Sequence, residues 1–271
     1  MGTEFLEQPG GRIAYQEVGG SGPVVLCAPG MGDRREVYRF LGPRLVDAGY
    51  RVVTTDLRGH GESSAGWADY SPAAAGRDLL ALVRRLDAGP AELVGSSFTP
   101  ASAIWAAAEA PELVAGIVLI APWASDPKLN PVMRLMSGLV GRFPALWARF
   151  YRSLYPTAPP ADLPGYLIDL RANLAEPGRM AALRAMMWAP KAECNDRIIE
   201  VRCPVLVVMG RKDPDFPDPE AEAHLIADRA ADATVAMIEG AGHYPQAEFP
   251  EPTAAAMLPF LARATATDAG R

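Results

Sequence analysis

One stretch in the middle of the chain, residues 91–110, limits the fold more than any other. Ala91 to Gly95 form a short apolar run typical of a buried strand, and residues 100–110 form an Ala-rich helical pattern. Ser97 therefore falls in a sharp turn between a strand and a helix. Such a turn pushes its apex side chain out of the sheet and needs small residues on both sides. The stretch predicts a serine presented at a sheet edge; an ordinary turn whose serine caps the helix is the alternative.

Strands and helices alternate on both sides of this turn. A hairpin is expected first, from two short strand-like runs joined by Pro9-Gly10-Gly11. The strands expected after it cover residues 24–28, 51–56, 91–95, 113–120, 204–210 and 234–238, with helices over 35–48, 73–87 and 100–110. This alternation predicts an α/β fold with a doubly wound, mostly parallel sheet.

The alternation stops between residues 124 and 200. This segment holds helical stretches rich in Met, Leu and aromatic residues, separated by proline clusters. We expect a helical cap here, inserted between two strands of a core domain that residues 1–123 and 201–271 form. The alternative is that these helices belong to the core, because their apolar faces must pack on something.

Composition excludes several classes of protein. The 271 residues, 49% hydrophobic, suit one large domain with an insertion, and a net charge of −6 argues against a nucleic-acid partner. The three cysteines are too few and too scattered for a disulfide framework or a metal knuckle. The N-terminus lacks a secretory signal, and no apolar run reaches the roughly 20 residues of a membrane span. We therefore expect a cytoplasmic protein with a small-molecule substrate and no metal or cofactor; its oligomeric state stays open.

Two glycine-containing loops follow early strands. Pro29-Gly30-Met31-Gly32 comes directly after the strand at 24–28, and such a loop can present backbone N–H donors to an oxyanion. The second loop, Asp56 to Ser63, reads D-x-R-G-x-G-x-S. It looks very like a loop of the family named below, and that resemblance implies a structural role for His60.

Together with Gly95-Ser96-Ser97-Phe98-Thr99, these loops resemble the α/β-hydrolase superfamily. The G-x-S-x-G pattern of its nucleophile turn is present except that Thr99 replaces the last glycine, and Pro29 stands where a histidine is common. The resemblance implies that Ser97 is a nucleophile and that the backbone N–H groups of Met31 and Phe98 form an oxyanion hole.

A nucleophilic serine needs a base within hydrogen-bond reach. His243 lies in a loop after the strand at 234–238, where a base can be delivered to the carboxyl edge of the sheet. His224 falls inside a helix that begins near Pro219, where an exposed position is expected. We therefore expect His243 to be the base.

The base needs a carboxylate to orient it. Asp213 follows the strand at 204–210 at the position where the superfamily commonly has its acid, and Ser97, Asp213 and His243 follow one another in the superfamily's order. Asp126 is a second candidate, while Asp215 is expected at a turn or a helix N-terminus.

The residues thus predict a serine hydrolase that cleaves an ester, thioester or lactone of a small to medium apolar substrate through an acyl-enzyme. Because fold and triad do not fix the reaction, the alternative is a ligand-binding receptor or a non-hydrolytic member of the same fold that retains the triad. The residues expected to bind substrate are Gly30, Trp123, Met136, Trp147, Tyr151 and Met187.

Overall fold

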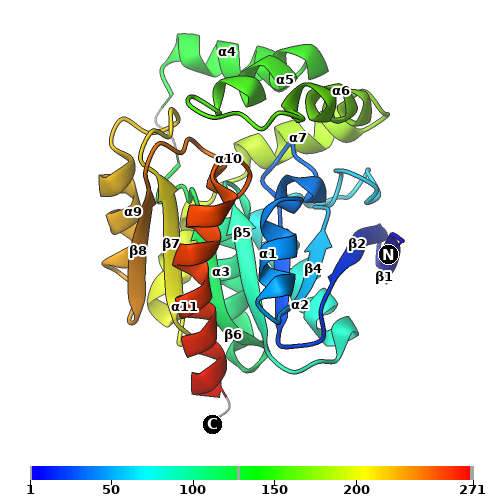
Figure 1. The fold of residues 1–271 in the computed structure, drawn as a ribbon. Helices are drawn as coiled ribbons and strands as arrows, with labels where there is room; N and C mark the ends of the chain where they lie inside the picture. The colour runs from blue at the N-terminus through cyan, green and yellow to red at the C-terminus, as the bar shows by residue number, and fades with distance from the viewer. Residues whose placement is uncertain (1, 127–128, 269–271) are drawn as a thin grey trace.

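Eight strands form one sheet in the computed structural model, which describes residues 2–126 and 129–268 (Figure 1). The strand order is β1-β2-β4-β3-β5-β6-β7-β8. Strand β2 pairs antiparallel with β1 and with β4. The remaining pairs, along the order β4-β3-β5-β6-β7-β8, are parallel, which confirms the mostly parallel α/β fold. The strands are β1 Glu4–Gln8, β2 Gly11–Gly19, β3 Val24–Ala28, β4 Arg51–Thr55, β5 Ala91–Ser96, β6 Val114–Ile120, β7 Val205–Gly210 and β8 Ala233–Ile238.

Helices cover both faces of the sheet (Figure 1). Helices α1 and α11 pack together on one face, and α2 and α3 pack together on the other. None of the helices in the described residues has both the length and the apolar character needed to cross a membrane. The helices outside the insertion are α1 Leu41–Asp47, α2 Pro72–Leu86, α3 Thr99–Glu109, α9 Pro219–Ala227, α10 Pro245–Glu248 and α11 Pro250–Asp268, with short 3-10 turns η1 Arg35–Tyr38, η2 Pro111–Leu113 and η3 Arg197–Glu200.

The segment between β6 and β7 forms helices only, as far as its residues are described. Figure 1 shows its first four helices gathered over one end of the sheet. We call α4 to α8 the helical insertion. Its helices are α4 Pro131–Val140, α5 Pro144–Ser153, α6 Leu163–Leu174, α7 Arg179–Trp188 and α8 Ala192–Asp196.

The strand order reverses at β3. Strand β4 lies on one side of β3 and β5 on the other, so the chain reverses its direction across the sheet at this point. Ligands in open α/β sheets bind outside the carboxyl ends of the strands at such a switch point. Because Ala28 and Gly95 are register partners, the loop that begins at Pro29 and the turn at Ser97 start side by side.

One expected helix, over residues 35–48, is interrupted. The turn η1 ends at Tyr38 and α1 begins at Leu41. Pro43 has no N–H to donate to the carbonyl of Arg39, four residues earlier, so a regular α-helix cannot continue through this point.

Buried polar contacts fix the loop that follows β4. The Asp56 carboxylate accepts hydrogen bonds from the backbone N–H groups of Arg35 at 2.8 Å and Glu62 at 3.0 Å. The Arg58 guanidinium donates two hydrogen bonds of 2.8 Å to Asp78 on α2. The D-x-R-G-x-G-x-S pattern thus joins this loop to α2.

We expect the pair of Arg58 and Asp78 to be important for stability. Both side chains are 9% exposed, so Arg58→Ala leaves a buried carboxylate without its cation, which costs about 3–5 kcal/mol of unfolding free energy. Arg77→Ala is the matched control, because Arg77 pairs with Asp69 at 2.8 Å on the surface, where a pair contributes about 1 kcal/mol or less. Urea denaturation of both variants measures the difference, and equal losses would contradict this role of Arg58.

Candidate active site

Ser97 lies in the turn between β5 and α3 with a left-handed backbone, at φ 58°. Non-glycine residues rarely adopt this conformation, and here the Ser97 N–H is held by the carbonyl of Ile120 at 2.8 Å. A Cβ on Gly95 would lie 2.8 Å from the carbonyl carbon of Thr99, so glycine is required where the strand meets the helix. The turn directs the Ser97 side chain into a cavity.

Thr99 replaces the second glycine of the pattern without crowding β5. Its side chain is buried, and its hydroxyl donates a hydrogen bond to the carbonyl of Pro29. Gly30 completes the close approach, since a Cβ there would lie 2.9 Å from the Cβ of Ser97. The substitution therefore adds a contact between the serine turn and the loop after β3.

The loops after β7 and β8 bring Asp213 and His243 together. Nδ1 of His243 lies 2.7 Å from Oδ2 of Asp213, and both side chains are buried. Oδ2 of Asp215 lies 3.7 Å from the same nitrogen. Burial lowers the pKa of His243, but the two carboxylates outweigh burial and raise this pKa to about 9. Two carboxylates therefore act on the imidazole, where the sequence indicated one.

The helical insertion and helix α10, which follows the histidine loop, both support that loop. The backbone N–H of His243 donates to the carbonyl of Leu154 at 3.1 Å. The buried Glu248 accepts a 2.6 Å hydrogen bond from the N–H of Gly242 and, through its other oxygen, one of 3.0 Å from Thr157. The position of His243 thus depends on chain far from it in sequence.

The other candidate bases lie outside the cavity, whereas the other candidate acid lies in its wall. His60 is buried beside the carbonyl of Arg58, outside the cavity, and burial lowers its pKa to about 4. His224 is exposed on α9. Asp126 does line the cavity, but its carboxylate accepts a 3.0 Å hydrogen bond from the backbone N–H of Lys191.

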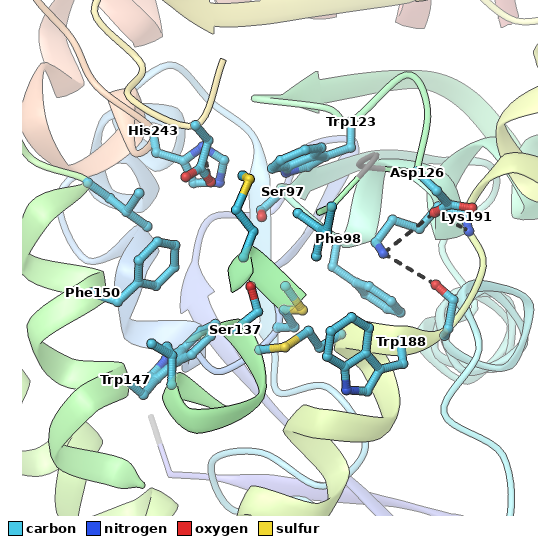
Figure 2. Close-up of a pocket in the computed structure, with 18 of the residues that line it drawn as sticks. Ser97, Phe98, Trp123, Asp126, Ser137, Trp147, Phe150, Trp188, Lys191 and His243 are labelled. Carbon is cyan, nitrogen blue, oxygen red and sulfur yellow. Dashed lines mark hydrogen bonds and ion pairs between the residues drawn. The ribbon is translucent and has the colours of Figure 1, made fainter. Parts of the chain in front are cut away.

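Figure 2 shows the cavity, with a volume of about 760 Å³, into which Ser97 and His243 both point. Side chains of α4, α5 and α7 form much of its wall and are mainly apolar. Tyr151 does not line it: this buried side chain donates a 3.0 Å hydrogen bond to Asp33 instead. Gly30 does not line it either, because the close approach of its backbone to Ser97 leaves no room for a side chain. The other residues expected to bind substrate all line the cavity, namely Trp123, Met136, Trp147 and Met187.

Two backbone N–H groups beside Ser97 are available as donors. Neither Met31 nor Phe98 donates its backbone N–H to another described residue, and both residues line the cavity. Donors fixed in advance near a reacting carbonyl can stabilise the negative charge that develops on its oxygen. The arrangement can therefore support acyl transfer.

The same acids and histidine are also the kind of group that binds a cation. One ligand atom from each of Asp213, Asp215 and His243 lies within 4.8 Å of the others. The 2.7 Å between Nδ1 and Asp213 is, however, the length of a charge-assisted hydrogen bond. This nitrogen is thus already engaged by the carboxylate.

A family model described as the alpha/beta hydrolase family matches residues 24–256. The chain belongs to the alpha/beta hydrolase family. It is therefore a hydrolase of this superfamily by descent. The 2-(acetamidomethylene)succinate hydrolase of Mesorhizobium japonicum is 29% identical over 89% of this chain and 89% of its own length.

Solved structures of this family agree with the fold. An esterase from Thermogutta terrifontis is 26% identical, with a TM-score of 0.78 over 97% of this chain and 99% of its own. A bromoperoxidase from Bacillus anthracis has a TM-score of 0.83 at 21% identity over 96% of this chain and 100% of its own. Proteins named for different activities thus share this fold.

The pH dependence of hydrolysis should report the two carboxylates around His243. If His243 is the base, it works only when neutral, so kcat/KM should rise with pH up to the pKa of about 9. Asp215→Asn removes one charge that raises this pKa, so the rising limb should move to lower pH. Asp228→Asn, beside the exposed His224, is the control and should leave the limb in place. A limb that stays fixed in Asp215→Asn would contradict the role of Asp215.

Proposed function

We propose that the protein is a serine hydrolase of carboxylic esters, with Ser97 as nucleophile, His243 as base and Asp213 as the carboxylate that orients the base. The observation that carries this proposal is the 2.7 Å contact of His243 with Asp213 at the wall of the cavity that Ser97 also lines. A serine hydroxyl is a weak nucleophile until a neighbouring base takes its proton. With Nδ1 held by Asp213, Nε2 is the nitrogen left to do so.

The reaction would follow the acyl-enzyme route. Oγ of Ser97 attacks the ester carbonyl carbon while His243 takes the hydroxyl proton, and the N–H groups of Met31 and Phe98 bind the oxyanion. The C–O bond of the ester then breaks, and His243 gives its proton to the leaving alcohol. A water molecule attacks the acyl-enzyme with the same proton transfers, releasing the acid and restoring Ser97.

The cavity wall supports a substrate of small to medium size with an apolar body. In this proposal residues 124–200 act as a cap on a core of residues 1–123 and 201–271, and Trp123, Met136, Trp147 and Met187 contact the substrate. Thioesters and lactones would react by the same steps. The esterase from Thermogutta terrifontis supports an ester among these substrates.

A fluorophosphonate probe tests the proposal directly. An activated serine forms a stoichiometric adduct, so the wild-type protein should label and Ser97→Ala should not. Asp213→Asn should fold normally yet lower kcat by about 10⁴-fold, because an amide favours the wrong imidazole tautomer. Asp126→Asn is the matched control and should retain labelling. A folded wild-type protein that does not label would instead favour a ligand receptor with a retained triad.

The apolar wall predicts a dependence on acyl chain length. Each methylene buried from water contributes about 0.8 kcal/mol, or roughly 4-fold in kcat/KM. In a series of 4-nitrophenyl esters, kcat/KM should therefore rise from acetate through medium chains and level off when the cavity is filled. A steady fall from acetate would show that the apolar wall does not bind the acyl chain.

A further inference from the structure

Lys191 is a cation inside the cavity that the proposed mechanism does not use. It lies between α7 and α8, and its side chain is only 6% exposed. It lines the same cavity as Ser97, and its ammonium lies 6.0 Å from the centre of the Phe98 ring. A positive charge is therefore placed in the same mainly apolar cavity as the proposed nucleophile.

The ammonium is only partly compensated by the protein. Its hydrogen bond to the carbonyl of Ala189 is 3.3 Å long, and the nearest oxygen of Asp126 is 3.8 Å away, beyond hydrogen-bond distance (Figure 2). That oxygen accepts its own 3.0 Å hydrogen bond from the backbone N–H of Lys191. An ammonium carries three N–H donors, and the described residues accept from one of them in a cavity that Lys191 lines.

A buried charge with this little pairing lowers the stability of the folded protein, so its presence calls for a functional reason. Burial lowers the pKa of Lys191, and Asp126 only partly opposes this effect. An apolar side chain of similar length would fill the same space without this cost. An anionic group of a ligand would supply the missing acceptor and the missing negative charge.

We propose that Lys191 binds a carboxylate of the substrate, so that the ester this protein hydrolyses combines an apolar body with one negative charge. The proposal rests on the proposed esterase function and specifies its substrate class. Lys191 determines specificity and takes no part in the proton transfers at Ser97. Asp126 fixes the backbone of Lys191 and leaves its ammonium available.

Arg134 is the other Lys or Arg side chain among the described residues that line the cavity. It lies on the exposed helix α4, and its guanidinium packs 5.3 Å from the ring centre of Trp188. Solvent screens an exposed charge, whereas a buried ammonium acts on a ligand with little screening. The geometry therefore assigns the carboxylate to Lys191 rather than to Arg134.

Two pairs of substrates test this assignment, one for each side of the ester bond. The mono-4-nitrophenyl ester of adipic acid is compared with its ω-carboxamide, and 4-acetoxybenzoate is compared with 4-acetoxybenzamide. Each pair differs only by carboxylate against amide. In at least one pair the wild-type enzyme should prefer the carboxylate by about 10-fold or more in kcat/KM, as expected for a charge-assisted hydrogen bond.

Variants then identify the residue responsible. Lys191→Met should abolish the preference by lowering kcat/KM for the carboxylate substrate while leaving that for the amide unchanged. Lys191→Arg should retain part of the preference, and Arg134→Met should leave it unchanged. Asp126→Asn keeps an acceptor for the backbone N–H but removes the competing charge, so it should increase the preference by about 5-fold. This variant tests the proposal even if Lys191→Met does not fold.

Several outcomes would overturn the assignment. One is that the wild-type enzyme shows no carboxylate preference in either pair. Another is that Lys191→Met lowers kcat/KM equally for both members of a pair. A third is that Arg134→Met, rather than Lys191→Met, loses the preference. Calorimetric binding of 6-phenylhexanoate against 6-phenylhexanamide separates this proposal from the esterase function, because it needs no turnover. Discrimination that depends on Lys191 without hydrolysis would refute the esterase alone, whereas hydrolysis without discrimination would refute the carboxylate site alone.

Discussion

The left-handed backbone at Ser97 is the constraint on which the site depends. A non-glycine residue in this conformation costs of order 1 kcal/mol or more and persists only where its surroundings hold it. Here β5 is buried between β3 and β6, and the carbonyl of Ile120 at the end of β6 binds the Ser97 N–H. Gly95 and Gly30 then allow α3 and the loop after β3 to approach within the distance that the side chain of any other residue would prevent.

The helical insertion is joined to the core at the loops that form the site. Nε1 of Trp147 donates a 2.7 Å hydrogen bond to the carbonyl of Gly32, and the Tyr151 hydroxyl donates to Asp33. Burial raises the pKa of Asp33 to about 7, although the hydroxyls of Tyr151 and Tyr166 oppose this effect. Through Leu154 the insertion also holds the backbone of His243. Helix α5 therefore forms part of the wall of the site.

Local rules explain how much of this could be predicted from the sequence. Strand runs and turn glycines depend on neighbours in the chain. The roles of Ser97, Asp213 and His243 came from the resemblance to the superfamily, and the structure brings the last two into contact. The carboxylate of Asp215 and the ammonium of Lys191 reach the site through packing between distant elements, which no spacing reveals. Spacing likewise does not show which aromatic residues of the insertion face the cavity and which pack in the core. It therefore could not show that Trp147 lines the cavity and that Tyr151 does not. Asp126 was a second candidate for the acid, and in the structure its carboxylate accepts a hydrogen bond from the backbone N–H of Lys191.

The charged groups of the cavity lie at two ends, and this division constrains how the proposed anionic ester could lie in it. Figure 2 shows His243 and Lys191 on opposite sides of Ser97, and Asp213 and Asp215 accompany His243. An anionic substrate is repelled by the carboxylates at one end and attracted by the ammonium at the other, so its charge selects one of two orientations. The apolar wall contributes to affinity in either orientation but cannot distinguish them, because burial of apolar surface has no direction. In the proposed reaction, charge would thus supply the orientation that the hydrophobic effect alone cannot give.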